Sequence, residues 1–182
     1  TLIGGLAGDA ITTASNNTAV GYQSLTRATT GANNVAVGAN ASWGNTTGAN
    51  NISVGVTALN ANSTGASNVG IGHQALYTNS TASSNTAVGY QSLYANTTGH
   101  SNLALGANAL DANTTASINT AVGFNAGTTN TTGNLTAFGG YAAQAQTTGT
   151  NTTALGSFSL YANTTGANNT AVGSAFGATR GV

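Results

Sequence analysis

A glycine that follows an apolar residue recurs every seventeen residues along the chain, and this period constrains the fold more than any other feature. Nine of the ten intervals are 17 residues and one, from Gly123 to Gly139, is 16. A unit this short cannot bury a core of its own and must stack on its neighbours. We therefore predict a single repeat domain over residues 1–182, with incomplete first and last units. The glycines are Gly4, Gly21, Gly38, Gly55, Gly72, Gly89, Gly106, Gly123, Gly139, Gly156 and Gly173.

The three residues before each glycine alternate in a way that is typical of a β-strand. A mostly β-branched residue and an apolar residue flank a small one that is nearly always alanine. Alternation with period two places successive side chains on opposite faces of a strand. We expect the apolar residue to face inward and form the core. That column is Ile3 in the first unit and then Val20, Val37, Val54, Ile71, Val88, Leu105, Val122, Phe138, Leu155 and Val172.

A leucine four residues after the glycine is the second expected core anchor, as in Leu25, Leu59, Leu76, Leu93, Leu110 and Leu160. It is replaced at Ser42, Gly127 and Ala143, where a cavity or a neighbouring aromatic such as Trp43 would compensate. The following Asn-Thr-Thr-Gly stretch favours a turn, because Asn and Gly tolerate positive φ. The unit then reads strand, turn, strand, turn.

Stacking such units gives an all-β fold, a parallel β-solenoid or β-roll of about eleven 17-residue repeats. With coils ~4.8 Å apart, the rod would be roughly 50 Å long. The residue missing from the 16-residue unit falls between Gly133 and Asn134, and a deletion there is expected to lie in a turn.

Composition excludes several classes of function. Only four side chains are formally charged, Asp9, Arg27, Asp111 and Arg180, so the basic surface that nucleic acid or an anionic membrane requires is absent. There is no cysteine for a disulfide or thiolate metal site and no apolar run long enough to span a bilayer. The first residues do not resemble a signal peptide, and the start at Thr1 suggests a processed or partial chain.

No set of residues has the spacing of a catalytic or metal site. His73 and His100 occupy different positions of the repeat, and neither has a carboxylate, Ser or Cys companion at a suitable spacing. Asp9 and Asp111 share a repeat position but lie six units apart, too far to act as a pair. We expect no enzyme activity, no cofactor and no metal.

The turn carries an Asn-x-Thr sequon in seven units, which is the acceptor pattern for N-glycosylation. If the turn is exposed, glycans would coat one edge of the rod and keep a neutral protein soluble. The alternative is that Asn and Thr simply suit turns and ladders. The candidate sites are Asn45, Asn62, Asn79, Asn96, Asn113, Asn130 and Asn163, and further sequons begin at Asn16, Asn40, Asn51, Asn134, Asn151 and Asn168.

Aromatic and threonine columns suggest two other surfaces. Aromatics follow some glycines directly, and a second group lies five positions after the glycine, at Trp43, Tyr77, Tyr94 and Tyr161. These are candidates for surface or inter-chain contacts, either stacking on sugars or filling a seam between chains. Paired threonines such as Thr97 and Thr98 suggest an ice-binding ladder, although only one of each pair can face outward.

The phrase Asn-Thr-Ala-Val-Gly-Tyr-Gln-Ser-Leu-Tyr-Ala-Asn-Thr-Thr-Gly over residues 85–99 resembles repeats of bacterial surface and phage tail-fibre proteins. More loosely, the chain is similar to the head repeats of YadA-like trimeric autotransporter adhesins, which have a shorter repeat. The resemblance covers nearly the whole chain. It implies a left-handed parallel β-roll, commonly a homotrimer, that serves as an extended stalk or adhesive head.

Together these features predict an extracellular structural fibre or adhesin segment on a cell surface or virion. The expected partners are copies of itself, in a trimer or a head-to-tail filament, together with covalent or host-surface glycans. One alternative is a phage tail-fibre shaft that binds host glycans. Another is an ice-binding solenoid with a threonine ladder.

Overall fold

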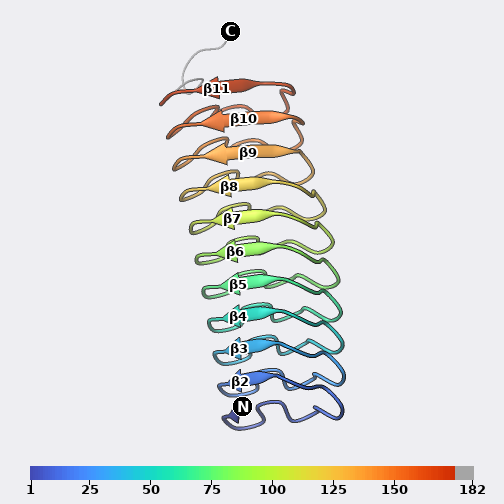
Figure 1. The fold of residues 1–182 in the computed structure, drawn as a ribbon. Coiled ribbons are helices and arrows are strands. Elements are labelled where there is room, and N and C mark those ends of the chain that lie inside the picture. Colours follow the sequence, from blue (N-terminus) through green and yellow to red (C-terminus); the bar gives the residue numbers. More distant parts are fainter. Residues whose placement is uncertain (175–182) are drawn as a thin grey trace.

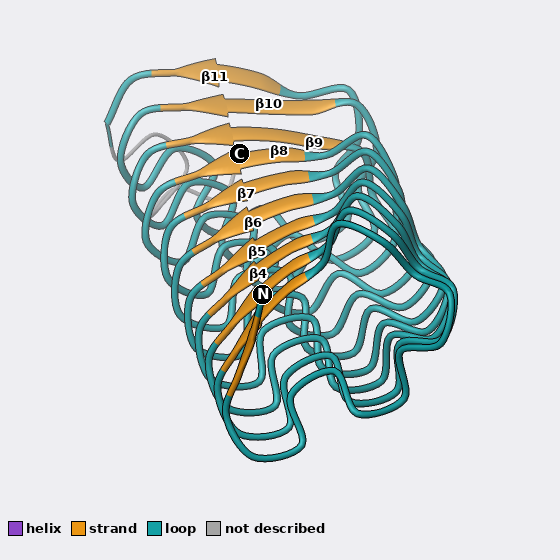
Figure 2. Ribbon diagram, turned by 60° about the horizontal axis from the view of Figure 1, so that its bottom comes forward, coloured by secondary structure: helices purple, strands orange, loops and turns teal. Residues whose placement is uncertain are grey.

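The computed structural model describes residues 1–174 and forms a single column of stacked coils (Figure 1). Each coil contributes one short strand, and every strand pairs in parallel with the next to give one sheet in chain order. Each connection passes once around the coil, as Figure 2 shows. The β-solenoid prediction is therefore confirmed. The strands are β1 (Leu2–Ile3), β2 (Thr18–Val20), β3 (Val35–Val37), β4 (Ile52–Val54), β5 (Val69–Ile71), β6 (Thr86–Val88), β7 (Leu103–Leu105), β8 (Thr120–Val122), β9 (Leu135–Phe138), β10 (Thr152–Leu155) and β11 (Thr170–Val172).

The second strand expected in each unit is absent from residues 1–174. Left-handed residues interrupt that half of the coil, such as Gln91 at φ 52° and Leu93 at φ 50°. Backbone hydrogen bonds between coils nevertheless continue, for example from Leu93 N to Ala109 O at 3.0 Å and from Thr97 N to Thr114 O at 2.9 Å. The coils therefore stack along their whole circumference, although only one side has strand geometry.

The recurring glycine is required by both conformation and space, as Gly89 illustrates. Its φ is +136°, a region that side chains rarely adopt. A Cβ on Gly89 would also lie 2.6 Å from the carbonyl oxygen of Gly106 in the next coil. The glycine thus recurs every seventeen residues because one turn of the coil brings each of these positions against the backbone of the equivalent glycine in the next coil.

The sheet register follows the repeat and absorbs its one irregularity. Aligned residues are seventeen apart at most pairings, such as Thr86 with Leu103, but sixteen apart where Thr120 pairs with Thr136. The missing residue is removed from the corner before β9, so the strands stay in phase. The prediction that the deletion lies outside the strand is confirmed.

The core lies between the inward face of the strands and the leucine column. Leu25, Leu59, Leu76, Leu93 and Leu110 are fully buried, as expected, and Leu160 packs against the same core. The small residue at the centre of each strand faces them, as Ala87 and Ala104 do. The interior is narrow at this point: a Cβ on Gly70, in the alanine column, would lie 3.2 Å from Leu59 Cγ.

The prediction that the apolar residue before each glycine forms the core is wrong. The strand turns its alanine inward, because only a small side chain fits opposite the leucine column, and the larger residues on either side face outward. They are partly or largely exposed, from Val20 to Val172. The misplaced residues are Val20, Val37, Val54, Ile71, Val88, Leu105, Val122, Phe138, Leu155 and Val172.

Two of the leucine replacements have a visible compensation, and neither is an aromatic or a cavity. Ser42 Oγ donates a 2.9 Å hydrogen bond to Ser53 Oγ, and both hydroxyls are buried. At Gly127 the space is occupied by Leu135, whose Cδ2 would lie 2.5 Å from a Cβ at that position. The missing leucine is therefore compensated locally. In one coil a hydrogen-bonded pair of serines takes its place, and in the other a leucine from another repeat position fills the space.

Candidate interaction surface

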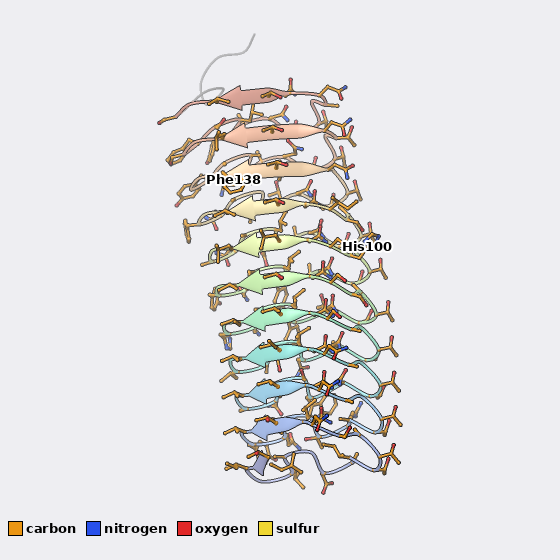
Figure 3. All side chains as sticks on the ribbon, in the orientation of Figure 1. His100 and Phe138 are labelled. Atoms are coloured by element: carbon orange, nitrogen blue, oxygen red, sulfur yellow. The ribbon has the colours of Figure 1, made fainter. Side chains whose placement is uncertain are left out.

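The outer face of the sheet, which we call the strand face, consists of the two residues that flank the inward small residue of each strand. The residue after it is apolar in every strand, whereas the residue before it is apolar in four strands and threonine in six: Thr18, Thr86, Thr120, Thr136, Thr153 and Thr170. Leu105, Phe138 and Leu155 are 44%, 40% and 46% exposed. Figure 3 shows Phe138 at the arrowhead end of the strand stack, whereas His100 lies at the opposite corner.

The strand face is uncharged, because none of the four charged residues of the sequence belongs to it. Eleven strands at ~4.8 Å and two outward columns about 7 Å apart give a strip of roughly 370 Å². The largest apolar patch on a typical monomer is about 300–600 Å² and is often functional. The arrangement therefore suits contact with another apolar surface.

Aromatic residues after the glycine extend this surface around the corner. Tyr22, Tyr90 and Phe124 are about half exposed, and the His73 and Tyr90 rings stack with centroids 5.6 Å apart. Further along, Tyr141 and Phe158 stack at 4.8 Å. Sequence reasoning missed this last pair because other units have Asn, Gln or Thr at the same position. The sequence did contain a signal for this pair, since Tyr141 and Phe158 are aromatic at a repeat position that is polar in most other units.

The four aromatics predicted as surface or inter-chain contacts are only half-buried, and each is engaged within its own chain. Arg27 lies over the Trp43 ring at 3.7 Å, in cation–π geometry. Tyr77 and Tyr94 stack at 5.2 Å, and Tyr161 lies 5.6 Å from Phe158. Their exposed edges are open to a partner, but their stacked faces are used between coils.

The candidate glycosylation column points inward at six of its seven positions. Each of these asparagines is fully buried, and the prediction of a surface column is wrong for them: Asn45, Asn62, Asn79, Asn96, Asn113 and Asn130. Their amides form a ladder along the rod axis. Asn96 Nδ2, for example, donates to Asn79 Oδ1 at 2.9 Å and to Gly99 O at 2.9 Å. Only Asn163, in the same column, is half-buried.

A second buried asparagine ladder runs beside the first, through Asn17, Asn34, Asn51, Asn68, Asn85, Asn102 and Asn119. Asn85 Oδ1 accepts from Asn102 N at 2.9 Å, and Asn85 Nδ2 donates to Gly99 O at 2.8 Å. The Gly99 carbonyl thus accepts from both ladders. Buried amides need such partners, and these ladders satisfy them inside the coil. Of the further sequons, Asn51 is also buried, whereas Asn16, Asn134, Asn151 and Asn168 are exposed.

The paired threonines divide as predicted, with one member of each pair facing outward. Thr97 Oγ1 donates to Thr114 O at 3.0 Å, whereas Thr98 is exposed and its hydroxyl has no partner within residues 1–174. The exposed member forms one unbroken column of Thr13, Thr30, Thr47, Thr64, Thr81, Thr98, Thr115, Thr132, Thr148 and Thr165. A single column lacks the second dimension that a lattice of ordered water would require.

The 16-residue unit interrupts both asparagine ladders. The column of Asn119 continues with Leu135, and Asn119 Nδ2 turns to Asn113 Oδ1 at 3.4 Å. Asn130 Oδ1 is left buried without a hydrogen-bond partner. A hollow of about 390 Å³ opens at this corner. Its lining residues are Ile118, Asn134, Leu135, Thr136, Asn151, Thr152 and Thr153.

Within residues 1–174, no three His, Cys, Asp or Glu side chains lie close enough together to share a metal ion. His73 stacks on Tyr90, and His100 Nδ1 lies 3.3 Å from Ser101 Oγ at an exposed corner. Desolvation raises the pKa of the half-buried Asp111 carboxyl above its usual range. The described residues also include no helix of the length and hydropathy needed to cross a membrane.

No protein-family model, curated protein or solved structure matches this chain.

Proposed function

We propose that this protein is a segment of an extracellular structural fibre, a stiff solenoid rod that associates with copies of itself through the strand face. The observation that carries the proposal is the uncharged strip on the outside of the sheet, with its unbroken column of exposed apolar residues. A stable protein interface buries about 800 Å² on each partner. The strip supplies just under half of that area, and the exposed aromatics at its edge add to it.

The rest of the molecule supports a mechanical role. Hydrogen bonds link each coil to the next on every side, and two amide ladders run through the interior. Side chains that bear charge or chemistry are few and separate. Such a rod resists bending, and its polar turns face solvent while the strand face is covered by other copies.

Charge on the strand face tests the proposal. In the double variant Val88→Lys and Val122→Lys, two partly exposed side chains receive ammonium groups that must stay hydrated. The coil should still fold, because both long side chains can reach solvent. The assembly formed by the wild-type chain, trimer or polymer, should dissociate to monomer in light scattering coupled to size-exclusion chromatography.

A matched variant places the same charges elsewhere. Thr98→Lys and Thr132→Lys modify the exposed threonine column in coils of the same region, and assembly should persist. A wild-type chain that is monomeric at concentrations well above micromolar would refute self-association. If assembly persists in the strand-face variant but is lost in the threonine variant, the contact lies on the threonine column and the proposed surface is wrong.

A further inference from the structure

The corner before β8 contains a strained residue with no packing to offset its strain. In nearly every coil this position has φ near +60° and is occupied by Asn or Ser, as at Asn50, Ser84 and Asn168. In the coil before the deletion it is Ile118, at φ 64° and 70% exposed. The left-handed region costs a non-glycine residue roughly 1–2 kcal/mol, and a β-branched one is a genuine outlier there.

This strain coincides with the hollow at the shortened unit. Ile118 forms one wall, and the remaining walls carry groups whose hydrogen-bonding capacity is unused within the described residues. Thr136 is exposed and Thr153 is half-buried, and neither hydroxyl has a hydrogen-bond partner among residues 1–174. Asn134 and Asn151 donate their amide nitrogens to Ser117 O and Asn168 Oδ1, which leaves both amide oxygens available. Strained residues beside such groups are characteristic of ligand sites.

The chemistry of the walls selects the ligand class. Two amide oxygens accept hydrogen bonds from hydroxyl groups, two threonine hydroxyls both donate and accept, and an isoleucine offers an apolar surface. No charged side chain lines the hollow, so an ionic ligand would lose its hydration without compensation. A volume of about 390 Å³ lies within the range of small-ligand sites.

We propose that the hollow at the 16-residue unit binds a neutral saccharide. Ring hydroxyls bond to the Asn134 and Asn151 oxygens and to the Thr136 and Thr153 hydroxyls, while an apolar ring face packs on Ile118. The inference does not depend on self-association. However, Thr136 and Thr153 are the second residues of β9 and β10 and belong to the strand face, so assembly and binding are measured separately.

The experiment uses a panel of neutral trisaccharides of glucose, galactose, mannose and N-acetylglucosamine. Binding is followed by saturation-transfer NMR and titration on the full chain and on the Val88→Lys, Val122→Lys variant. At least one sugar should bind at millimolar concentration or tighter. Retention on the same sugar fixed to a support indicates a surface glycan, and binding only in solution indicates a free oligosaccharide.

Three variants locate the site. Inserting one asparagine between Gly133 and Asn134 restores a 17-residue unit and should reduce affinity at least tenfold. Ile118→Asn should weaken binding several-fold while raising thermal stability, a combination that loss of folding cannot produce. Thr136→Ala should weaken binding, whereas Thr86→Ala, at the same repeat position three coils away, should not.

Two results would overturn the inference. One is that no sugar of the panel binds either protein at millimolar concentration. The other is that a sugar binds the insertion variant as tightly as the wild type. If sugars bind the charged variant only, the site stands and the strand face is covered by another copy. If the wild type is monomeric and binds sugar, only the proposed assembly fails.

Discussion

At the scale of single residues, this protein depends on conformations that most residues avoid. From the coil of Gly21 to the coil of Gly156, each coil holds a leucine or its substitute and a further non-glycine residue at positive φ. Five of these leucines are fully buried: Leu25, Leu59, Leu76, Leu93 and Leu110. Each such residue costs of order 1–3 kcal/mol and persists only where its surroundings fix it. The surroundings here are the coils above and below, so local strain is tolerated because of stacking.

Gly89→Ala should be strongly destabilising. The new Cβ would lie 2.6 Å from the Gly106 carbonyl oxygen, at a φ of +136° that alanine rarely adopts. We expect a loss of about 3 kcal/mol or more, measured as a shift in the denaturant midpoint. Gly140→Ala is the control, since its Cβ would meet nothing nearer than 3.9 Å. Equal stability of the two variants would contradict this account of the period.

Asn96→Ala should cost about 2–4 kcal/mol in unfolding free energy. The change removes two amide donations and leaves Asn79 Oδ1 and Asn113 Nδ2 buried with fewer partners. Thr98→Ala, two residues away but exposed, should change stability by less than about 0.5 kcal/mol. If the two substitutions had similar effects in thermal denaturation, the asparagine ladder would not contribute as described.

Asp111→Asn should stabilise the protein at neutral pH. Desolvation raises the pKa of Asp111 in the folded state, so folding favours the protonated form. The contribution of Asp111 to wild-type stability should therefore be complete below the ordinary pKa of an aspartate and should be lost as the pH rises through the raised pKa. The variant should lack this decline, as Asn60 occupies the same repeat position without charge. A wild-type melting temperature that rises with pH in this range, relative to that of the Asp111→Asn variant, would contradict the prediction.

At the scale of the element, one coil consists of a short strand and a longer connecting segment. The backbone of this segment is hydrogen-bonded to the neighbouring coils but does not have the extended conformation of a strand. Its regularity comes from stacking, and the 16-residue unit shows the limit of that regularity. The strands stay paired across it, because the missing residue is taken from the corner. The side-chain ladders do not survive, because an asparagine column needs the same depth in every coil.

Ile118→Asn should raise the unfolding free energy by about 1 kcal/mol. Asparagine tolerates the left-handed region, which isoleucine does not, and the 70% exposed isoleucine side chain loses little packing. The reverse change, Ser84→Ile, should destabilise by a similar amount at the equivalent corner. Matching melting temperatures for wild type and Ile118→Asn would show that the corner carries no strain.

At the scale of the whole molecule, the rod is neutral inside and outside, and its association should be insensitive to salt. Screening acts on charged groups, and the strand face has none. We expect the dissociation constant of the assembly to change less than about threefold between 50 mM and 500 mM sodium chloride. Sedimentation velocity measures this. Dissociation at high salt would assign the contact to Asp9, Arg27 or Asp111 instead.

The periodicity of the sequence explains which parts of the structure were predictable. The solenoid, the leucine anchors and the site of the deletion follow from a periodic pattern that only stacking can satisfy. The strand face and the asparagine ladders do not follow, because a three-residue strand has only two possible orientations and the sequence favours burying its larger side chains. Val88 was assigned to the wrong side for this reason, whereas Asn45 was misplaced because its turn was expected to be exposed.

What the sequence alone determined is the architecture, since glycine at every seventeenth residue fixes the pitch and a unit that short must stack. What only the tertiary structure decided is the inside and outside of each coil. Opposite the leucine column, the interior has room only for a small residue such as alanine at the centre of each strand. The large apolar residues therefore lie outside, on the surface that we assign to assembly.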